Sequence, residues 1–174
     1  MKLKKLTVFA IARGLDTAQG TDGTTIWISF LMNTIGGPNS GIELVRGTNT
    51  NIATFGFDTN GTAGFGFADK QGTENDIVVA PQNGTTLFWE ARIDYGAGNS
   101  DDIELFINGA SVGTSSGNDL SFDSLGFLNF SNSPGSTIDE TRIGDTRADV
   151  SAVPEPSSFL LLALGGLTLV RRKR

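Results

Sequence analysis

The stretch Thr85–Ala110, TTLFWEARIDYGAGNSDDIELFINGA, determines the fold class predicted for this chain. Apolar and polar residues alternate in both of its halves, which are separated by the turn-forming residues GAGNSDD. A period of two places alternate side chains on opposite faces of a β-strand, so the stretch predicts two antiparallel strands joined by a turn. The residues predicted to face the core are Leu87, Trp89, Ala91, Ile93 and Tyr95 before the turn and Ile103, Leu105 and Ile107 after it.

Shorter segments with the same alternation lie on both sides of this hairpin. They are Thr25–Met32, Ser40–Gly47, a second hairpin within residues 51–70 around an Asn60-Gly61 turn, SLGFLNFS (124–131) and TIDETRIG (137–144). No segment of twelve residues before Val153 shows the helical period. So many short strands predict an all-β domain built from two packed antiparallel sheets.

Composition and charge exclude several classes of function. The 174 residues contain neither Cys nor His, which argues against zinc sites and against Ser-His or Cys-His nucleophilic catalysis. Sites for hard cations built from carboxylates remain open. The formal net charge is −6, but residues 6–152 contain 6 basic and 18 acidic residues and therefore carry −12. A surface this acidic repels nucleic acid, so no nucleic-acid partner is predicted.

The C-terminal segment VPEPSSFLLLALGGLTLVRRKR (153–174) combines three parts in a fixed order. Val153, Pro154, Glu155 and Pro156 form an extended segment, because each proline fixes φ and disfavours helix in its predecessor. The apolar run that follows is shorter than the roughly 20 residues of a permanent membrane span. A short run ended by positive charges fits a sorting signal that enters the membrane transiently better than a plain anchor or a buried core helix. The predicted membrane segment consists of Phe159, Leu160, Leu161, Leu162, Ala163, Leu164, Gly165, Gly166, Leu167, Thr168, Leu169 and Val170, and the predicted stop-transfer end consists of Arg171, Arg172, Lys173 and Arg174.

Three pieces of the chain resemble a known family of bacterial proteins. GTTIWISFLM (23–32), LFWEARIDYGAGNSDDIELFING (87–109) and TIDETRIGDTRADVSAVPEP (137–156) are similar to concanavalin/laminin-G-like jelly-roll proteins that carry a PEP-CTERM tail. The resemblance runs from about Gly14 to the end, and the tail is its most specific part. It implies a two-sheet antiparallel jelly-roll sandwich and a short C-terminal apolar helix. It also implies an exosortase, a membrane protease that cleaves near Pro-Glu-Pro and releases or re-attaches the protein outside the cell.

The start of the chain has two interpretations. Three lysines, the apolar run Leu6–Ala12 and its Ala-Ile-Ala end form a miniature secretory signal. Alternatively, this run is a strand whose upstream partners are missing, since family members usually carry a long signal peptide and further strands before TIWISF. The chain then resembles an N-terminally shortened member, with exposed sheet edges and part of its core uncovered. The predicted division is a short signal or remnant strand (1–13), a jelly-roll domain (14–148), a linker with the VPEP motif (149–156) and the PEP-CTERM helix with its basic end (157–174).

One cluster of oxygen-bearing side chains is a candidate calcium site. Asp94, Asn99, Asp101 and Asp102 gather around the DYGAGNSDD turn, where carboxylates and backbone carbonyls could bind Ca²⁺. Their spacing matches no EF-hand pattern, and solvated turn carboxylates are the preferred interpretation. No other cofactor is predicted.

The strand carboxylates Glu43, Glu90 and Glu104 are the remaining candidates for catalysis. A glycosidase needs two carboxylates that face each other about 5–9.5 Å apart. The concanavalin-like enzymes usually show an E-x-D-x-E cluster on one strand, which this chain lacks, so no enzymatic activity is predicted. Trp27 could stack on a sugar ring, whereas Trp89 and Tyr95 are predicted to be core residues.

These observations together predict an exported, exosortase-sorted and non-catalytic protein of the cell surface or extracellular matrix. The resemblance implies a biofilm or exopolysaccharide setting, in which a polysaccharide is a further candidate partner. The C-terminal helix is expected in the inner membrane only transiently. The alternatives are a glycan-active enzyme, an ice- or surface-binding protein, and a truncated gene fragment.

Overall fold

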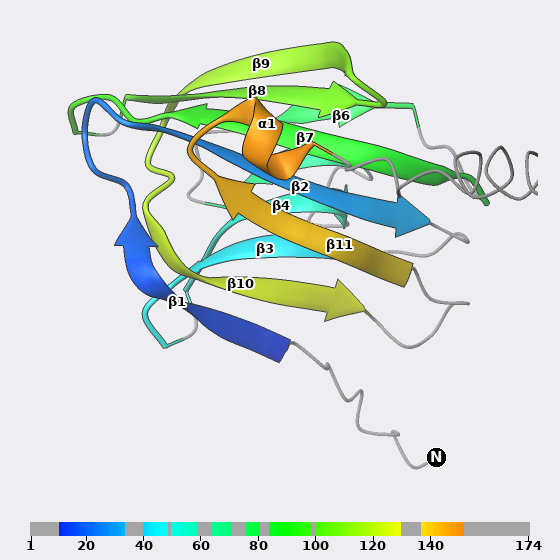
Figure 1. The fold of residues 1–174 in the computed structure, drawn as a ribbon, viewed down its shortest axis with the longest axis horizontal. Coiled ribbons are helices and arrows are strands. Elements are labelled where there is room, and N and C mark those ends of the chain that lie inside the picture. The colour runs from blue at the N-terminus through cyan, green and yellow to red at the C-terminus, as the bar shows by residue number, and fades with distance from the viewer. Residues whose placement is uncertain are drawn as a thin grey trace, which may run out of the picture.

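The computed structural model shows two antiparallel β-sheets packed face to face, which confirms the predicted all-β sandwich (Figure 1). Sheet A has the strand order β1-β10-β3-β4-β5-β6, and sheet B has the order β11-β2-β7-β8-β9. The structure describes residues 11–33, 40–48, 50–58, 64–70, 76–80, 84–98, 100–129 and 137–151.

The strands are short, as the sequence predicts. Sheet A consists of β1 (Ile11–Gln19), β3 (Ser40–Arg46), β4 (Thr50–Asp58), β5 (Gly64–Asp69), β6 (Ile77–Val79) and β10 (Phe122–Asn129). Sheet B consists of β2 (Thr25–Asn33), β7 (Thr86–Asp94), β8 (Asp101–Ile107), β9 (Ala110–Asn118) and β11 (Thr137–Gly144). A single turn of helix, α1 (Arg147–Val150), follows β11.

The strands of both predicted hairpins pair with each other as antiparallel neighbours. In the first, Ala91 of β7 lies opposite Leu105 of β8, and both are buried. In the second, Phe55 of β4 lies opposite Phe67 of β5. The predicted Asn60-Gly61 turn between β4 and β5 lies outside the described residues.

The largest buried side chains in the core between the sheets are aromatic. The indole of Trp89 is fully buried, stacks on Phe30 at a centroid distance of 5.6 Å and meets the ring of Phe65 edge-on at 4.8 Å. Tyr95 is 4% exposed. Trp89 and Tyr95 are therefore core residues, as predicted, and neither ring is free to stack on a sugar.

The two ends of the sandwich differ from the predicted boundaries. Strand β1 begins at Ile11, three residues before the predicted domain start, because it pairs with β10 from Ile11 opposite Phe127 onward. At the other end, α1 was not predicted, and the side chain of its Val150 is completely buried. The described elements thus extend beyond residues 14–148 in both directions. The predicted C-terminal apolar helix lies outside the described residues.

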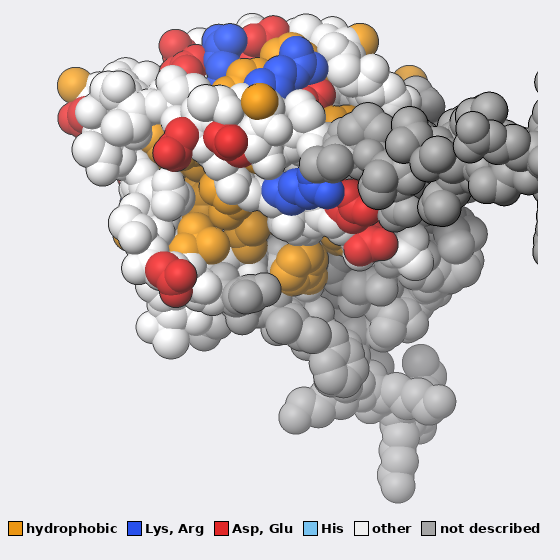
Figure 2. Space-filling view, in the orientation of Figure 1, with side chains coloured by type: hydrophobic (Ala, Val, Ile, Leu, Met, Phe, Trp, Pro, Cys, Tyr) orange, Lys and Arg blue, Asp and Glu red, His pale blue; other side chains and the backbone are white. Residues whose placement is uncertain are grey.

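The two long sides of the sandwich are closed to different degrees. On one side β6 packs against β9, where Gly113 lies so close to Ile77 that an added Cβ would be 2.5 Å from its Cγ2 atom. On the other side a groove of about 290 Å³ separates β1 and β10 from β11. Figure 2 shows its floor as an apolar hollow. The groove is lined by Gly14, Leu15, Asp16, Leu125, Phe127, Thr141 and Ile143.

Candidate functional site

The predicted sorting segment, residues 153–174, lies outside the described residues, so the structure shows the point from which it leaves the sandwich. The last described residue is Ser151. It follows α1, which packs on β11 and β2 of sheet B (Figure 1). We call residues 146–151 the C-terminal clamp, because side chains from several strands hold them against the sheet.

A local capping arrangement starts α1. The Asp149 carboxylate accepts hydrogen bonds from the Thr146 backbone N–H at 3.0 Å and from its hydroxyl at 2.7 Å. This satisfies a backbone donor that the start of a helix leaves unpaired. Gly144 allows the close approach, since a Cβ added there would lie 2.4 Å from Cβ of Asp149.

Arg147 carries the main contact between the clamp and sheet B. Its Nε and Nη2 atoms donate to the two carboxylate oxygens of Glu90 at 2.9 and 2.8 Å. The guanidinium also lies over the rings of Phe106 and Trp27, at 4.6 and 5.5 Å from their centroids. The Glu90 side chain is 3% exposed, and its hydrogen bonds raise the pKa of Arg147. A buried carboxylate is thus neutralised by a planar cation that is stacked on two aromatic rings.

The backbone at the end of the clamp is also held. The buried Ser29 hydroxyl of β2 donates to the Val150 carbonyl at 2.7 Å, and Nη1 of Arg142 in β11 donates to the Ser151 carbonyl at 2.7 Å. The Ser151 N–H donates to the Arg147 carbonyl at 2.9 Å. The chain is therefore fixed up to the residue that precedes Ala152.

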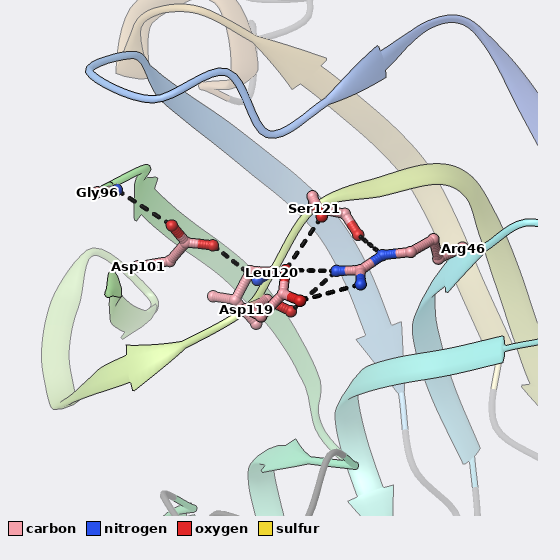
Figure 3. A network of polar contacts seen from close by, with 6 residues as sticks. All are labelled: Arg46, Gly96, Asp101, Asp119, Leu120 and Ser121. Atoms are coloured by element: carbon pink, nitrogen blue, oxygen red, sulfur yellow. Dashed lines mark hydrogen bonds and ion pairs between the residues drawn. The ribbon is translucent and has the colours of Figure 1, made fainter. Parts of the chain in front are cut away.

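A second polar network surrounds Asp101, one of the predicted calcium ligands (Figure 3). Asp101 as a whole residue is 4% exposed, and its carboxylate accepts hydrogen bonds from the backbone N–H groups of Gly96 at 3.0 Å and Leu120 at 2.7 Å. Burial raises the pKa of Asp101, and the two N–H donors oppose that shift. Asp101 thereby fixes both the turn after β7 and the segment that crosses from β9 to β10.

Arg46 of sheet A extends this network to the crossing segment. It donates to the Asp119 carboxylate at 3.0 and 2.5 Å and to the Ser121 carbonyl at 2.9 Å (Figure 3). The hydrogen bond from Arg46 lowers the pKa of Asp119. The network therefore joins a strand of sheet A to the connection that leaves sheet B.

The predicted calcium ligands have different surroundings. Asp94 accepts hydrogen bonds from the Thr25 hydroxyl at 2.7 Å and from Nε of Arg92 at 2.9 Å, whereas Asp102 is exposed. Asn99 lies outside the described residues. Within the described ranges, no group of three acidic side chains could hold a metal ion. Both Asp94 and Asp101 are hydrogen-bonded to other groups of the protein, and the calcium site stays a prediction.

The three strand glutamates are divided between the two sheets. Glu90 pairs with Arg147, and Glu104 pairs with Arg92 at 3.2 Å, both on sheet B. Glu43 belongs to β3 of sheet A, where Asn51 donates to its carboxylate. Burial raises the pKa of Glu43. Trp27, whose role the sequence left open, packs on Phe106 at a centroid distance of 5.6 Å beneath Arg147.

Sequence comparison identifies the tail. Residues 152–174 match the family model of the PEP-CTERM protein-sorting motif, which confirms the predicted sorting signal. Such a motif implies export and sorting through the membrane to the cell surface by an exosortase, a membrane protease. No curated protein matches the chain. In the part of the chain that the structure describes, no helix is long and apolar enough to cross a membrane.

Structure comparison supports the jelly-roll sandwich. The chain is similar to an endo-β-1,4-glucuronan lyase from the fungus Trichoderma reesei, with a TM-score of 0.52, 11% identity and coverage of 84% of this chain and 77% of the lyase. A tetrameric galectin from the ball sponge Cinachyrella sp. gives a TM-score of 0.48 at 12% identity, covering 77% of this chain and 98% of the galectin. At these identities the likeness to the lyase shows the fold alone.

Sequence reasoning missed the C-terminal clamp. One local signal was present, since Thr146 and Asp149 have the spacing of a helix capping box. The partner of Arg147 could not be predicted, because Glu90 is 57 positions away in the chain.

Proposed function

We propose that this protein is exported, sorted at its C-terminus by an exosortase-type membrane protease, and acts at the cell surface or in the extracellular matrix without catalysing a reaction. The observation that carries the proposal is the match of residues 152–174 to the PEP-CTERM sorting motif. This match begins at the residue after Ser151, the last residue of the clamp.

Each part of the tail has a separate role in this proposal. Val153, Pro154, Glu155 and Pro156 form the extended segment that the protease recognises. Phe159–Val170 enters the bilayer as a short helix, and Arg171–Arg174 remain on the cytoplasmic side and stop transfer. The linker then consists of residues 152–156, because residues 149–151 belong to the clamp.

Two ion pairs and the position of a third glutamate support a non-catalytic sandwich. Glu90 and Glu104 are each paired with an arginine, and Glu43 belongs to the opposite sheet. A pair of carboxylates that act as acid and base or nucleophile has to be free to reach the substrate. We also propose that the sandwich binds a polysaccharide, since it shares its fold with a glucuronan lyase. The excess of acidic residues favours a neutral polysaccharide.

The sorting proposal is tested in a host with and without its exosortase gene. The full-length protein, a Glu155→Gln variant and the control Asp145→Asn are compared in the membrane and extracellular fractions. Asp145 is exposed and lies upstream of the motif, so its substitution removes a nearby acidic residue without changing the recognition segment. We expect processing of the parent chain and of D145N only when the exosortase is present, and a loss of at least ten-fold for E155Q. Processing that does not depend on the exosortase gene contradicts the proposal.

Polysaccharide binding is tested separately on the full-length protein in detergent. Affinity electrophoresis in gels containing a neutral β-glucan or alginate measures retention, and the same polymers are checked for release of reducing ends. We expect retardation in the neutral gel without release of reducing ends. A release of reducing ends contradicts the non-catalytic assignment, and unchanged migration in both gels contradicts polysaccharide binding.

A further inference from the structure

We propose that the C-terminal clamp is a positioning device for the sorting reaction, and that Ala152 is the first residue that the membrane protease can engage. Arg147 is its positioning residue. The inference rests on the proposed function, because it assigns a role in the same sorting reaction to residues upstream of the motif.

The first step concerns the Arg147–Glu90 pair. With α1 docked, the Glu90 side chain is 3% exposed, because it lies on the outer face of sheet B that α1 covers. Release of α1 would break both hydrogen bonds of a bidentate, charge-assisted pair that the docked state shields from water. Stacking on Phe106 and Trp27 adds to this preference. The docked state of the clamp is therefore the favoured state.

The second step concerns the backbone. A protease binds its substrate as an extended peptide, largely through main-chain hydrogen bonds. In the docked clamp, the carbonyl groups of Val150 and Ser151 already accept hydrogen bonds from Ser29 and Arg142. The Val150 side chain is fully buried beneath them. These residues cannot lie in a protease cleft while α1 is docked, which leaves the chain from Ala152 onward.

The third step is the length of chain that remains. Seven residues, 152–158, connect the clamp to the predicted membrane segment at Phe159. Fully extended, they span at most about 25 Å. Release of the clamp, residues 146–151, would add six more residues and extend that reach to about 45 Å. The docked clamp thus holds the Pro-Glu-Pro motif close to the folded domain and prevents cleavage upstream of it.

Arg147→Ala tests the clamp, and Arg92→Ala is the matched control. Arg92 lies on the same sheet, and its ion pairs with Asp94 and Glu104 are partly exposed and do not involve α1. Purified full-length proteins are treated with a nonspecific soluble protease, and the fragments are mapped by mass. We expect the parent chain and R92A to resist cleavage between residues 145 and 151, and R147A to be cut there at least ten-fold faster. Equal rates in R147A and the parent chain overturn the inference.

The same proteins are then expressed in the exosortase host, and the C-terminus of each processed chain is determined. We expect termini at or after Ala152 for the parent chain and R92A, and additional upstream termini for R147A. If the parent chain is not processed, the proposed function fails, while the fragments produced by the soluble protease still test the clamp.

Should R147A not fold cooperatively, Arg147→Lys replaces it in the soluble-protease experiment. Lysine keeps the charge but not the planar fork, so an intermediate cleavage rate is expected. A rate equal to that of the parent chain overturns the inference here as well.

Discussion

Glu90 and Asp101 are both buried carboxylates, and each is stabilised in a different way. The two oxygens of Glu90 face the guanidinium of Arg147, whereas those of Asp101 accept two backbone N–H groups. Glu90 forms an ion pair with Arg147 of the C-terminal clamp. The hydrogen bonds from the Gly96 and Leu120 N–H groups attach Asp101 to the segment that connects β9 of sheet B to β10 of sheet A. These donors take the place of water, so this carboxylate is buried although it lies next to a turn.

Removal of the Arg147 side chain should destabilise the sandwich more than removal of Arg92. We expect Arg147→Ala to lower the free energy of unfolding by about 2 kcal/mol, because it leaves Glu90 buried without a cation. This value is reduced from that of a fully buried pair because Arg147 is 42% exposed. Arg92→Ala should lower it by about 0.5 kcal/mol or less, since that side chain is 40% exposed. Urea unfolding measures both, and equal losses contradict the assignment.

The raised pKa of Asp101 predicts the pH dependence of stability. Folding then favours the protonated carboxyl, so the stabilising contribution is present at low pH and is lost as pH rises from about 3.8 through the raised pKa. We expect the free energy of unfolding of the parent chain to fall over this range relative to that of Asp101→Asn. Urea unfolding between pH 3 and 7 measures the difference. A relative gain with rising pH would show that the Gly96 and Leu120 donors outweigh burial.

At the scale of the elements, close pairing of the strands in sheet A depends on glycine. Gly66 of β5 has a φ of +151°, and a Cβ added there would lie 1.9 Å from the Ile77 carbonyl oxygen of β6. Gly14 of β1 has nothing within 4 Å of the same position. Glycine is therefore required at the first position and not at the second.

Gly66→Ala should consequently separate β5 from β6. We expect it to lower the free energy of unfolding by at least about 2 kcal/mol through strain and steric conflict. The matched change Gly14→Ala should alter it by less than about 0.5 kcal/mol. Thermal and urea unfolding compare the two variants, and a neutral effect of G66A would mean that the β5–β6 pairing is not as close as described.

The strands with alternating apolar residues could be predicted from the sequence, and others could not. Strands β2, β7 and β8 bury mainly one face, so the period of two marks them directly, and alternate phenylalanines mark the β4–β5 hairpin even though β4 is buried on both faces at residues 52–56. β9 (ASVGTSSGN) is a largely exposed edge strand without that pattern, and β6 has only three residues. Each pairs with the strand directly before it, β6 with β5 and β9 with β8, but as edge strands neither buries a face with a period of two that a local pattern could report.

At the scale of the whole molecule, the sandwich is closed at β6 and β9 and open along β11. Leu125, Phe127 and Ile143 belong to the core or pack against it, yet they line the groove on the open side (Figure 2). An uncovered part of the core was expected from one of the two interpretations of the start of the chain, that of an N-terminally shortened member. The position of the uncovered part follows from the order of strands in the two sheets, which the sequence did not show.

The sorting tail and the clamp differ in how far the sequence predicts them. The tail is a contiguous motif, so its order of prolines, apolar residues and positive charges could be recognised without a structure. The clamp depends on Arg147 meeting Glu90, Trp27 and Phe106, which come from three strands. Only the folded sheet brings these side chains together.

The most direct test of the sorting proposal is the intact mass of the protein from its native host, measured in the membrane and extracellular fractions. We predict an extracellular chain whose C-terminus lies between Ala152 and Pro156 and which lacks the apolar segment and the basic end. A cytoplasmic chain that still ends at Arg174, with no shortened species outside the cell, would contradict the proposed function.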